Sequence, residues 1–284
     1  MDRLVRPTSA VGTTGFESRQ IDRETITAGR DATMQAEKTV YGVSARAFFV
    51  VWLAGLVGAA AVIPYAFTLH GKVSEHAPMS PLWLASMSLA QSAVSLAIAT
   101  FVGLRLLGPA GYELIPTRPY ARLSILLGVG VAGAIVVAEA SFVHFSSYTG
   151  LPGVAVPAVW QGLLASLYGG ITEEILSRLF VMTLVAWAVG RLFGRSPRSA
   201  PVARSAILVS ALLFGIGHLP ALAQSGSLSA IVVVRTVCLN AMGGVVFGWL
   251  YWRRGLVAAM LAHLTADLVL HVIVPTVVGS LESR

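Results

Sequence analysis

Residues 158–190 read AVWQGLLASLYGGITEEILSRLFVMTLVAWAVG, and this stretch decides the fold class. A helix that crosses a bilayer needs about 20 mostly apolar residues. The stretch is longer than one crossing requires, so it predicts a membrane helix that is tilted or partly interfacial. It also holds Glu173, Glu174 and Arg178 inside the apolar run, where ionisable side chains are rare and usually functional.

Six further segments have the same apolar character, and turn-forming prolines and glycines separate most of them. The seven expected spans are 47–69, 82–107, 123–145, 158–190, 203–223, 228–251 and 256–279. The sequence therefore predicts an all-α fold, a polytopic transmembrane helical bundle of about seven spans. We expect a multi-pass integral protein of the cell membrane, with the lipid bilayer as a partner.

The composition excludes several other classes of protein. Hydrophobic residues make up 56% of the 284 residues and charged residues only 12%, against roughly 25% charged in an average soluble domain. Residues 1–46 hold 13 of the 33 charged residues, which leaves too few to cover a soluble fold. A soluble enzyme, a disordered protein and a disulfide-rich module are excluded, and Cys238 is the single cysteine.

Residues 1–46 are polar, carry both charges and lack hydrophobic periodicity. We expect a largely disordered cytoplasmic tail there, followed by a transmembrane domain at 47–284. The tail has no apolar core of a secretory signal, so the first span should remain in the mature protein.

The connecting loops predict the orientation. Arginines occur in the 2–3, 4–5 and 6–7 connections, while the 3–4 and 5–6 connections carry no Lys or Arg. This alternation predicts the N-terminus inside and the C-terminus outside. The net charge of +7 then reflects topology, and no basic stretch is interleaved with aromatic residues as in a nucleic-acid groove. We expect no nucleic-acid partner.

Span 4 holds the first functional candidates. Glu174 and Arg178 are four residues apart, so they share one helix face and can pair. Glu173 lies about 100° around the helix and has no partner in its own helix. Such a carboxylate suits a general base. The alternative is that both glutamates join one structural ion-pair network.

Spans 5 and 7 hold the second and third candidates. Span 5 reads Phe214-Gly-Ile-Gly-His218, and span 7 reads His263-Leu-Thr-Ala-Asp267. A lone histidine on an apolar helix is more often a packing or hydrogen-bonding residue, whereas a carboxylate beside an imidazole fixes its tautomer. Two histidines and one carboxylate make a site that activates water, with or without a metal. Glu173, His218 and His263 are candidate zinc ligands, although the usual H-E-x-x-H helix is absent.

Other polar residues within the spans leave alternatives open. Glu139 and Arg235 could pair with each other, or one could contact the site. Asn240 could bond across helices or donate into the site. His271 lies two turns beyond His263 on a similar face and is read as a supporting or packing residue.

Three motifs in order resemble the CPBP family, the CAAX proteases and bacteriocin-processing enzymes also called the Abi family. They are Glu-Glu-x-x-x-Arg at 173–178, Phe-x-x-x-His at 214–218 and His-x-x-x-Asp at 263–267. The eukaryotic branch of this family is the type II CAAX prenyl endopeptidase. The resemblance covers about residues 158–275, and spans 1–3 carry no motif match.

The resemblance implies an intramembrane endopeptidase that hydrolyses a peptide bond of a membrane-associated protein or peptide. Glu173 would activate the attacking water with help from His218. His263 and Asp267 would stabilise or orient the oxyanion site. The implied site residues are Glu173, Glu174, His218, His263 and Asp267 as catalytic residues, with Arg178 and Phe214 in support. A divalent metal such as zinc and a metal-free glutamate mechanism are both open.

Two positions depart from the family pattern. Ser177-Arg178-Leu179 stands where Phe-Arg-Gly is frequent, and Asp267 stands where Asn is frequent. An ionised Asp cannot donate a hydrogen bond to an oxyanion, so Asp267 is protonated, orients His263 or helps to hold a cation. Two other functions stay open: a catalytically silent bacteriocin-immunity or membrane scaffold protein, and an ion-coupled transporter, although no inverted repeat is visible.

Overall fold

The computed structural model describes residues 39–40, 43–69, 79–145, 157–224 and 228–282. The chain forms two units, Met1–Ala45 and Arg46–Arg284. In the first unit, strands β1 (Thr39–Val40) and β2 (Val43–Ser44) pair antiparallel. The rest of the expected tail lies outside the described residues.

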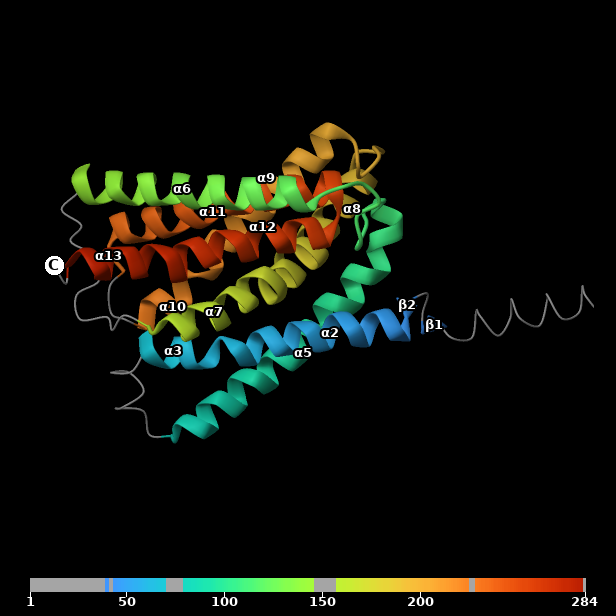
Figure 1. The fold of residues 1–284 in the computed structure, drawn as a ribbon. Coiled ribbons are helices and arrows are strands. Elements are labelled where there is room, and N and C mark those ends of the chain that lie inside the picture. Colours follow the sequence, from blue (N-terminus) through green and yellow to red (C-terminus); the bar gives the residue numbers. More distant parts are fainter. Residues whose placement is uncertain (1–38, 41–42, 70–78, 146–156, 225–227, 283–284) are drawn as a thin grey trace, which may run out of the picture. The chain divides into compact units, whose positions relative to one another are not determined.

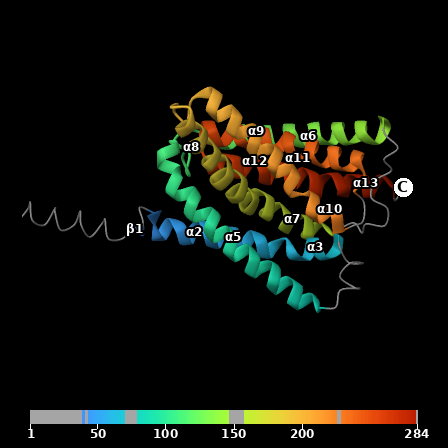
Figure 2. The same cartoon turned by 180° about the vertical axis from the view of Figure 1, so that it is seen from behind.

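The second unit is helical, and its helices are labelled in Figures 1 and 2. Most are α-helices: α2 (Ala45–Ala61), α3 (Ile63–Leu69), α5 (Pro81–Ala110), α6 (Ala121–Phe145), α7 (Val159–Leu167), α8 (Thr183–Leu192), α9 (Ala200–Gly217), α10 (Leu219–Gln224), α11 (Ala230–Arg254), α12 (Leu256–Leu268) and α13 (Val274–Glu282). Three segments are π-helical: η1 (Tyr168–Glu173), η2 (Ile175–Met182) and η3 (Val269–Ile273). The predicted all-α fold is confirmed.

Among the described residues, seven helical stretches are long and apolar enough to cross a membrane. They are Ala45–Leu69, Pro81–Ala110, Ala121–Phe145, Val159–Leu192, Ala200–Ala223, Ala230–Arg254 and Leu256–Leu281. The predicted spans and the multi-pass membrane protein are confirmed, and the side on which the N-terminus lies stays a prediction.

Helix caps explain why the helices run slightly beyond the apolar segments. Ser80 accepts a hydrogen bond from the Trp83 amide and starts α5. Gly111, at φ 70°, ends α5 in the left-handed conformation that glycine adopts without strain. The hydropathy of a segment carries no information about capping residues, so it predicts the ends of a span only approximately.

Helix α12 is central to the bundle. It packs on α6, α11, α7 and η1 (Figure 1). Small residues allow this, since Ala258, Ala259 and Ala262 are fully buried on it. The span that carries the third motif therefore packs against the spans that carry Glu139, Glu173 and Arg235.

Candidate active site

Span 4 carries its adjacent glutamates at a junction of two π-helical segments. Segment η1 ends at Glu173, and η2 begins directly after Glu174. Such segments are rare and frequently occur at functional sites. Gly169 and Gly170 let η1 lie against α12, because a Cβ at Gly169 would collide with the Asp267 carboxylate. The Tyr-Gly-Gly sequence thus brings Glu173 to the level of the third motif.

Glu174 and Arg178 form a fully buried ion pair, with Oε1 and Nη1 3.2 Å apart and both side chains 0% exposed. Glu174 Oε1 also lies 2.8 Å from His263 Nδ1. Arg178 Nη2 donates to the Gly244 carbonyl at 3.2 Å, and the guanidinium lies 5.0 Å from the centre of the Phe214 ring. The pair therefore joins span 4 to α9, α11 and α12.

The His263 ring is fixed by a hydrogen bond to Glu174 and by stacking on Phe247. Glu174, paired with Arg178, is a carboxylate that only accepts, so His263 Nδ1 carries the proton of that hydrogen bond. The ring stacks on Phe247, with centroids 4.4 Å apart and an interplanar angle of 21°. Its Nε2 then faces Glu173 Oε2 at 3.7 Å and Asp267 Oδ1 at 3.6 Å.

His218 follows the last residue of α9 and is oriented by its own helix. Its Nδ1 lies 2.8 Å from the Phe214 carbonyl, which can only accept, so Nδ1 donates. Its Nε2 faces Glu173 Oε1 at 3.7 Å. The Glu173 carboxylate thus lies between the Nε2 atoms of His218 and His263. Separations of 3.7 Å exceed hydrogen-bond length and suit bridging water.

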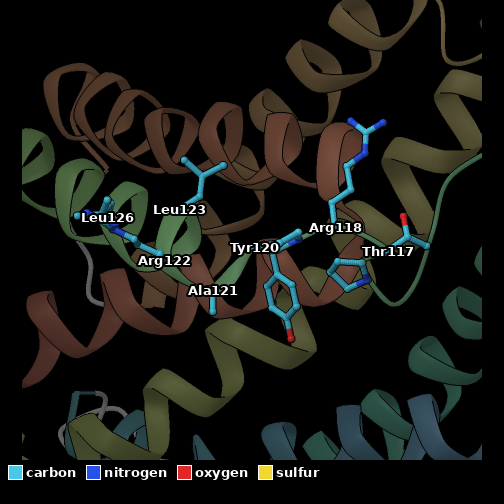
Figure 3. A pocket seen from close by; sticks show the side chains of 9 residues that line it. Thr117, Arg118, Tyr120, Ala121, Arg122, Leu123 and Leu126 are labelled. Atoms are coloured by element: carbon cyan, nitrogen blue, oxygen red, sulfur yellow. The ribbon is translucent and has the colours of Figure 1, made fainter.

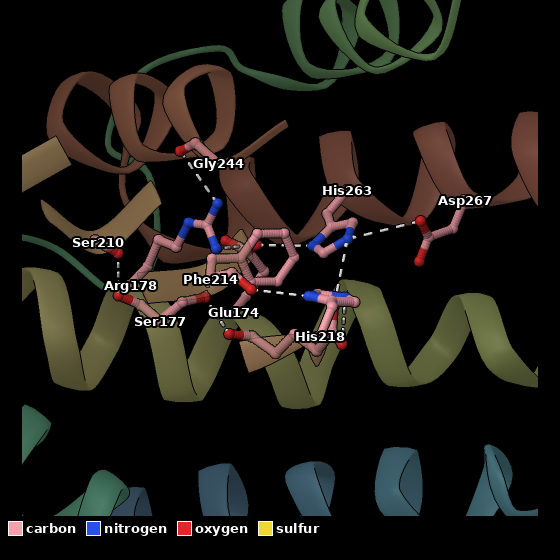
Figure 4. Close-up of polar contacts among 10 residues, drawn as sticks. Glu174, Ser177, Arg178, Ser210, Phe214, His218, Gly244, His263 and Asp267 are labelled. Carbon is pink, nitrogen blue, oxygen red and sulfur yellow. Dashed lines mark hydrogen bonds and ion pairs between the residues drawn. The ribbon is translucent and has the colours of Figure 1, made fainter. Parts of the chain in front are cut away.

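One cavity of about 290 Å³ connects these groups, and Figure 4 shows how their side chains converge from several helices. Its polar lining consists of Glu173, His218, Arg235, Thr236, Asn240, His263, Asp267 and His271. A water molecule occupies about 30 Å³ of liquid, so the cavity is large enough for water and part of a substrate. The three motifs from three spans meet here.

Comparison with known proteins relates the region that holds the three motifs to a known family. Residues 155–269 match the family model described as type II CAAX prenyl endopeptidase Rce1-like. This part of the chain is related to the CAAX proteases. The match includes all three motifs and confirms the resemblance. No curated protein and no solved structure matches the chain. A CAAX protease acts on a membrane-associated substrate in the bilayer.

Within the matched region, the departures from the first motif have local partners. Arg178 Nη1 donates to Ser177 Oγ, which donates to the Glu173 carbonyl. Ser210 Oγ donates to the Ser177 carbonyl at 2.7 Å. Leu179 packs on Gly103, where an added Cβ would lie 2.6 Å from Leu179 Cγ. The Ser177 hydroxyl thus bonds within its own span, Leu179 packs on α5, and the charged residues of the motif are present.

The other polar residues of the spans lie beside the same cavity. Arg235 Nε and Nη2 each lie 2.6 Å from an oxygen of the Glu139 carboxylate. Arg235 also lines the cavity, so this ion pair forms at the edge of the site. Asn240 Nδ2 donates at 2.8 Å to Thr236 of its own helix and likewise lines the cavity.

Sequence reasoning missed a polar connection to the first span. His271 Nε2 lies 3.9 Å from Asp267 Oδ1, and Tyr65 Oη lies 3.2 Å from His271 Nδ1. The helical spacing of His271 from Asp267 was a signal for the first contact. Tyr65 belongs to α3 and stands in no motif, so nothing in the sequence pointed to the second.

The candidate metal ligands all line this cavity. Glu173, His218 and His263 are residue types that bind zinc. Within the described ranges, however, no group of three or more His, Cys, Asp or Glu side chains has the geometry of a metal site.

Proposed function

We propose that this chain is an intramembrane endopeptidase in which Glu173 activates a water molecule. The observation that carries the proposal is the Glu173 carboxylate, 3.7 Å from each of two imidazole Nε2 atoms in a cavity within the bundle. Its side chain is only 17% exposed, so little water competes for it. Water exclusion strengthens each electrostatic interaction in the site.

The first step is attack by water. A water beside Glu173 donates one proton to the carboxylate as its oxygen attacks the substrate carbonyl carbon. His218 donates from Nδ1 to Phe214, so its neutral ring accepts at Nε2. The second O–H of the water therefore points at His218 Nε2, which orients the oxygen lone pair toward the substrate.

The developing oxyanion requires a hydrogen-bond donor. His263 Nδ1 is committed to Glu174, which leaves the facing pair of His263 Nε2 and Asp267 Oδ1, 3.6 Å apart. One proton held by this pair supplies the donor, whichever of the two atoms carries it. This assignment gives Asp267 a role where Asn is frequent, since an amide donates without an added proton.

The last step is breakdown of the tetrahedral intermediate. Protonated Glu173 passes its proton to the departing amine nitrogen as the C–N bond breaks. The products are a peptide with a new carboxylate and a peptide with a new amine. Glu173 returns to the carboxylate form, so each turnover consumes one water and one peptide bond.

The test is cleavage of a quenched peptide library by the purified full chain in detergent. Wild type is compared with Glu173→Gln and His218→Ala, with and without a chelator. Arg204→Gln is the matched control, since exposed Arg204 lies outside the catalytic cavity. We expect the two site variants to lose cleavage and the control to retain it. Glu173→Gln that stays folded and cleaves as wild type would overturn the proposal.

The same samples separate the other functions. The catalytically silent bacteriocin-immunity or scaffold protein is favoured by two results together. Folded, monodisperse wild type cleaves no peptide, and Glu173→Gln leaves bacteriocin immunity intact. Electrogenic flux in liposomes favours the transporter. Cleavage that a chelator removes and zinc restores would assign an ion to the candidate metal ligands Glu173, His218 and His263.

A further inference from the structure

A second polar cavity, of about 500 Å³, lies away from the catalytic residues. Its lining consists of Glu113, Thr117, Arg118, Arg198, Trp249, Arg253 and Arg254. Four guanidinium groups and one carboxylate thus share a cavity. It forms where the segment after α5, the segment before α9 and the end of α11 meet, so it lies at the ends of spans.

The positive charges of this arginine cavity are incompletely matched. Arg198 is engaged, since Nη1 donates to the Gly111 carbonyl at 2.8 Å and lies 3.9 Å from Glu113 Oε1. Arg254 Nε is buried with no hydrogen-bond partner in the described part of the chain. No carboxylate among the described residues lies within ion-pair distance of Arg118 or Arg254. Planar guanidinium groups bind phosphate oxygens in bidentate fashion.

An apolar trough continues from the arginine cavity. It is an open hollow of about 610 Å³ that shares Thr117 and Arg118 with that cavity, and Arg122 also lines it. Figure 3 shows its side chains following the segment into α6, ending at Leu126. Leu126 is 60% exposed on a membrane-spanning helix, so the trough opens toward the lipid. The ligand that fits both parts is an amphiphile with an anionic head.

We propose that the arginine cavity and the trough together bind one anionic phospholipid. Its phosphate lies among Arg118, Arg253 and Arg254, and an acyl chain follows Leu123 and Leu126. The location agrees with this chemistry, because headgroups lie at the ends of spans and basic pockets between membrane helices bind anionic headgroups.

The bound lipid would stabilise the turn between α11 and α12, and α12 carries a residue of the catalytic site. Arg253 and Arg254 end α11, and Gly255 at φ 90° turns the chain directly into α12, which carries His263. The Leu256 amide donates to the Glu113 carbonyl at 2.9 Å, which ties the loop after α5 to this turn. A headgroup that contacts both the loop after α5 and the turn between α11 and α12 therefore stabilises both.

The test is a titration of purified full chain in neutral detergent with short-chain phosphatidylglycerol, followed by thermal unfolding and by intrinsic tryptophan fluorescence, to which Trp249 contributes. Phosphatidylcholine of the same chain length and inorganic phosphate are run beside it. We expect saturable binding and a higher Tm with phosphatidylglycerol only. Equal effects of phosphatidylcholine would overturn the proposal, and phosphate binding of the same strength would leave an anion site without lipid specificity and also overturn it.

Three charge variants complete the test. Arg254→Gln and exposed Arg118→Gln should each weaken lipid binding about tenfold, as expected for loss of one charge-assisted contact. Arg118 lies in a loop, so its variant remains informative if Arg254→Gln unfolds. Glu113→Gln, which removes the one carboxylate among the described residues that line the cavity, should strengthen binding. The control is Arg204→Gln on the exposed face of α9. An equal loss of lipid affinity in this variant would show that the overall positive surface charge attracts the lipid, without a specific pocket.

Discussion

Replacing Glu174 with Gln tests the buried network that positions the catalytic histidine. The change keeps the shape of the side chain and removes its charge. Arg178 then remains 0% exposed, without the carboxylate that lies 3.2 Å from its Nη1. Leaving one partner of a buried ion pair uncompensated destabilises by about 3–5 kcal/mol. The contacts of Arg178 to Gly244 and Phe214 persist, so we expect the lower end of that range.

The matched variant removes both charges. In Glu174→Gln with Arg178→Met, no buried charge is left, and replacement of a buried pair by apolar groups is often neutral. We therefore expect the double variant to recover most of the lost unfolding free energy. It should not recover cleavage, because a Gln side chain does not impose one tautomer on His263.

The assay is thermal unfolding in detergent, read by near-UV circular dichroism, together with peptide cleavage. A loss of about 3 kcal/mol corresponds to a Tm lower by roughly 6–12 °C for a chain near this size. A Glu174→Gln protein as stable as wild type would refute the reasoning. So would a double variant that is less stable than the single one, since the penalty would then not come from an uncompensated charge.

Three further variants test separate parts of the site. Glu173→Gln should lower the cleavage rate at least about 100-fold, as for loss of a general base, with little change in Tm because its imidazole contacts are as long as 3.7 Å; rate and Tm falling together would point to a structural role. Asp267→Asn should retain cleavage within about tenfold and stay active at higher pH than wild type, because an amide donates without a proton that alkali removes; complete inactivity measured across pH would contradict the donor role. Gly169→Ala should cost about 1–3 kcal/mol and lower activity, because the new Cβ collides with the Asp267 carboxylate; wild-type Tm and activity would show that η1 and α12 separate easily.

The sequence predicted the spans and the motif residues for different physical reasons. Span positions follow from apolar length, because a bilayer accepts only long apolar helices. The pairing of Glu174 with Arg178 follows from helical spacing, which is local. Glu139 and Arg235 pair as one of two alternatives anticipated, because intramembrane charges usually find partners.

Contacts between distant spans were beyond this reasoning. Asp267 was expected beside His263 on the same helix, yet the hydrogen bond of His263 Nδ1 goes to Glu174, 89 residues away. The π-helical segments of span 4 change which side chains share a helix face, and no residue type in the sequence predicts such segments. The contact of Tyr65 with His271 depends on how the first span packs, which the apolar pattern does not encode.

The central claim is that Glu173 makes a water molecule the nucleophile. The most direct measurement is mass spectrometry of cleavage products formed in water labelled with a heavy oxygen isotope. The account predicts one heavy oxygen in each new carboxylate for wild type and Arg204→Gln, with no product above background for folded Glu173→Gln. Products without the label, or labelled product from Glu173→Gln at the wild-type rate, would contradict it.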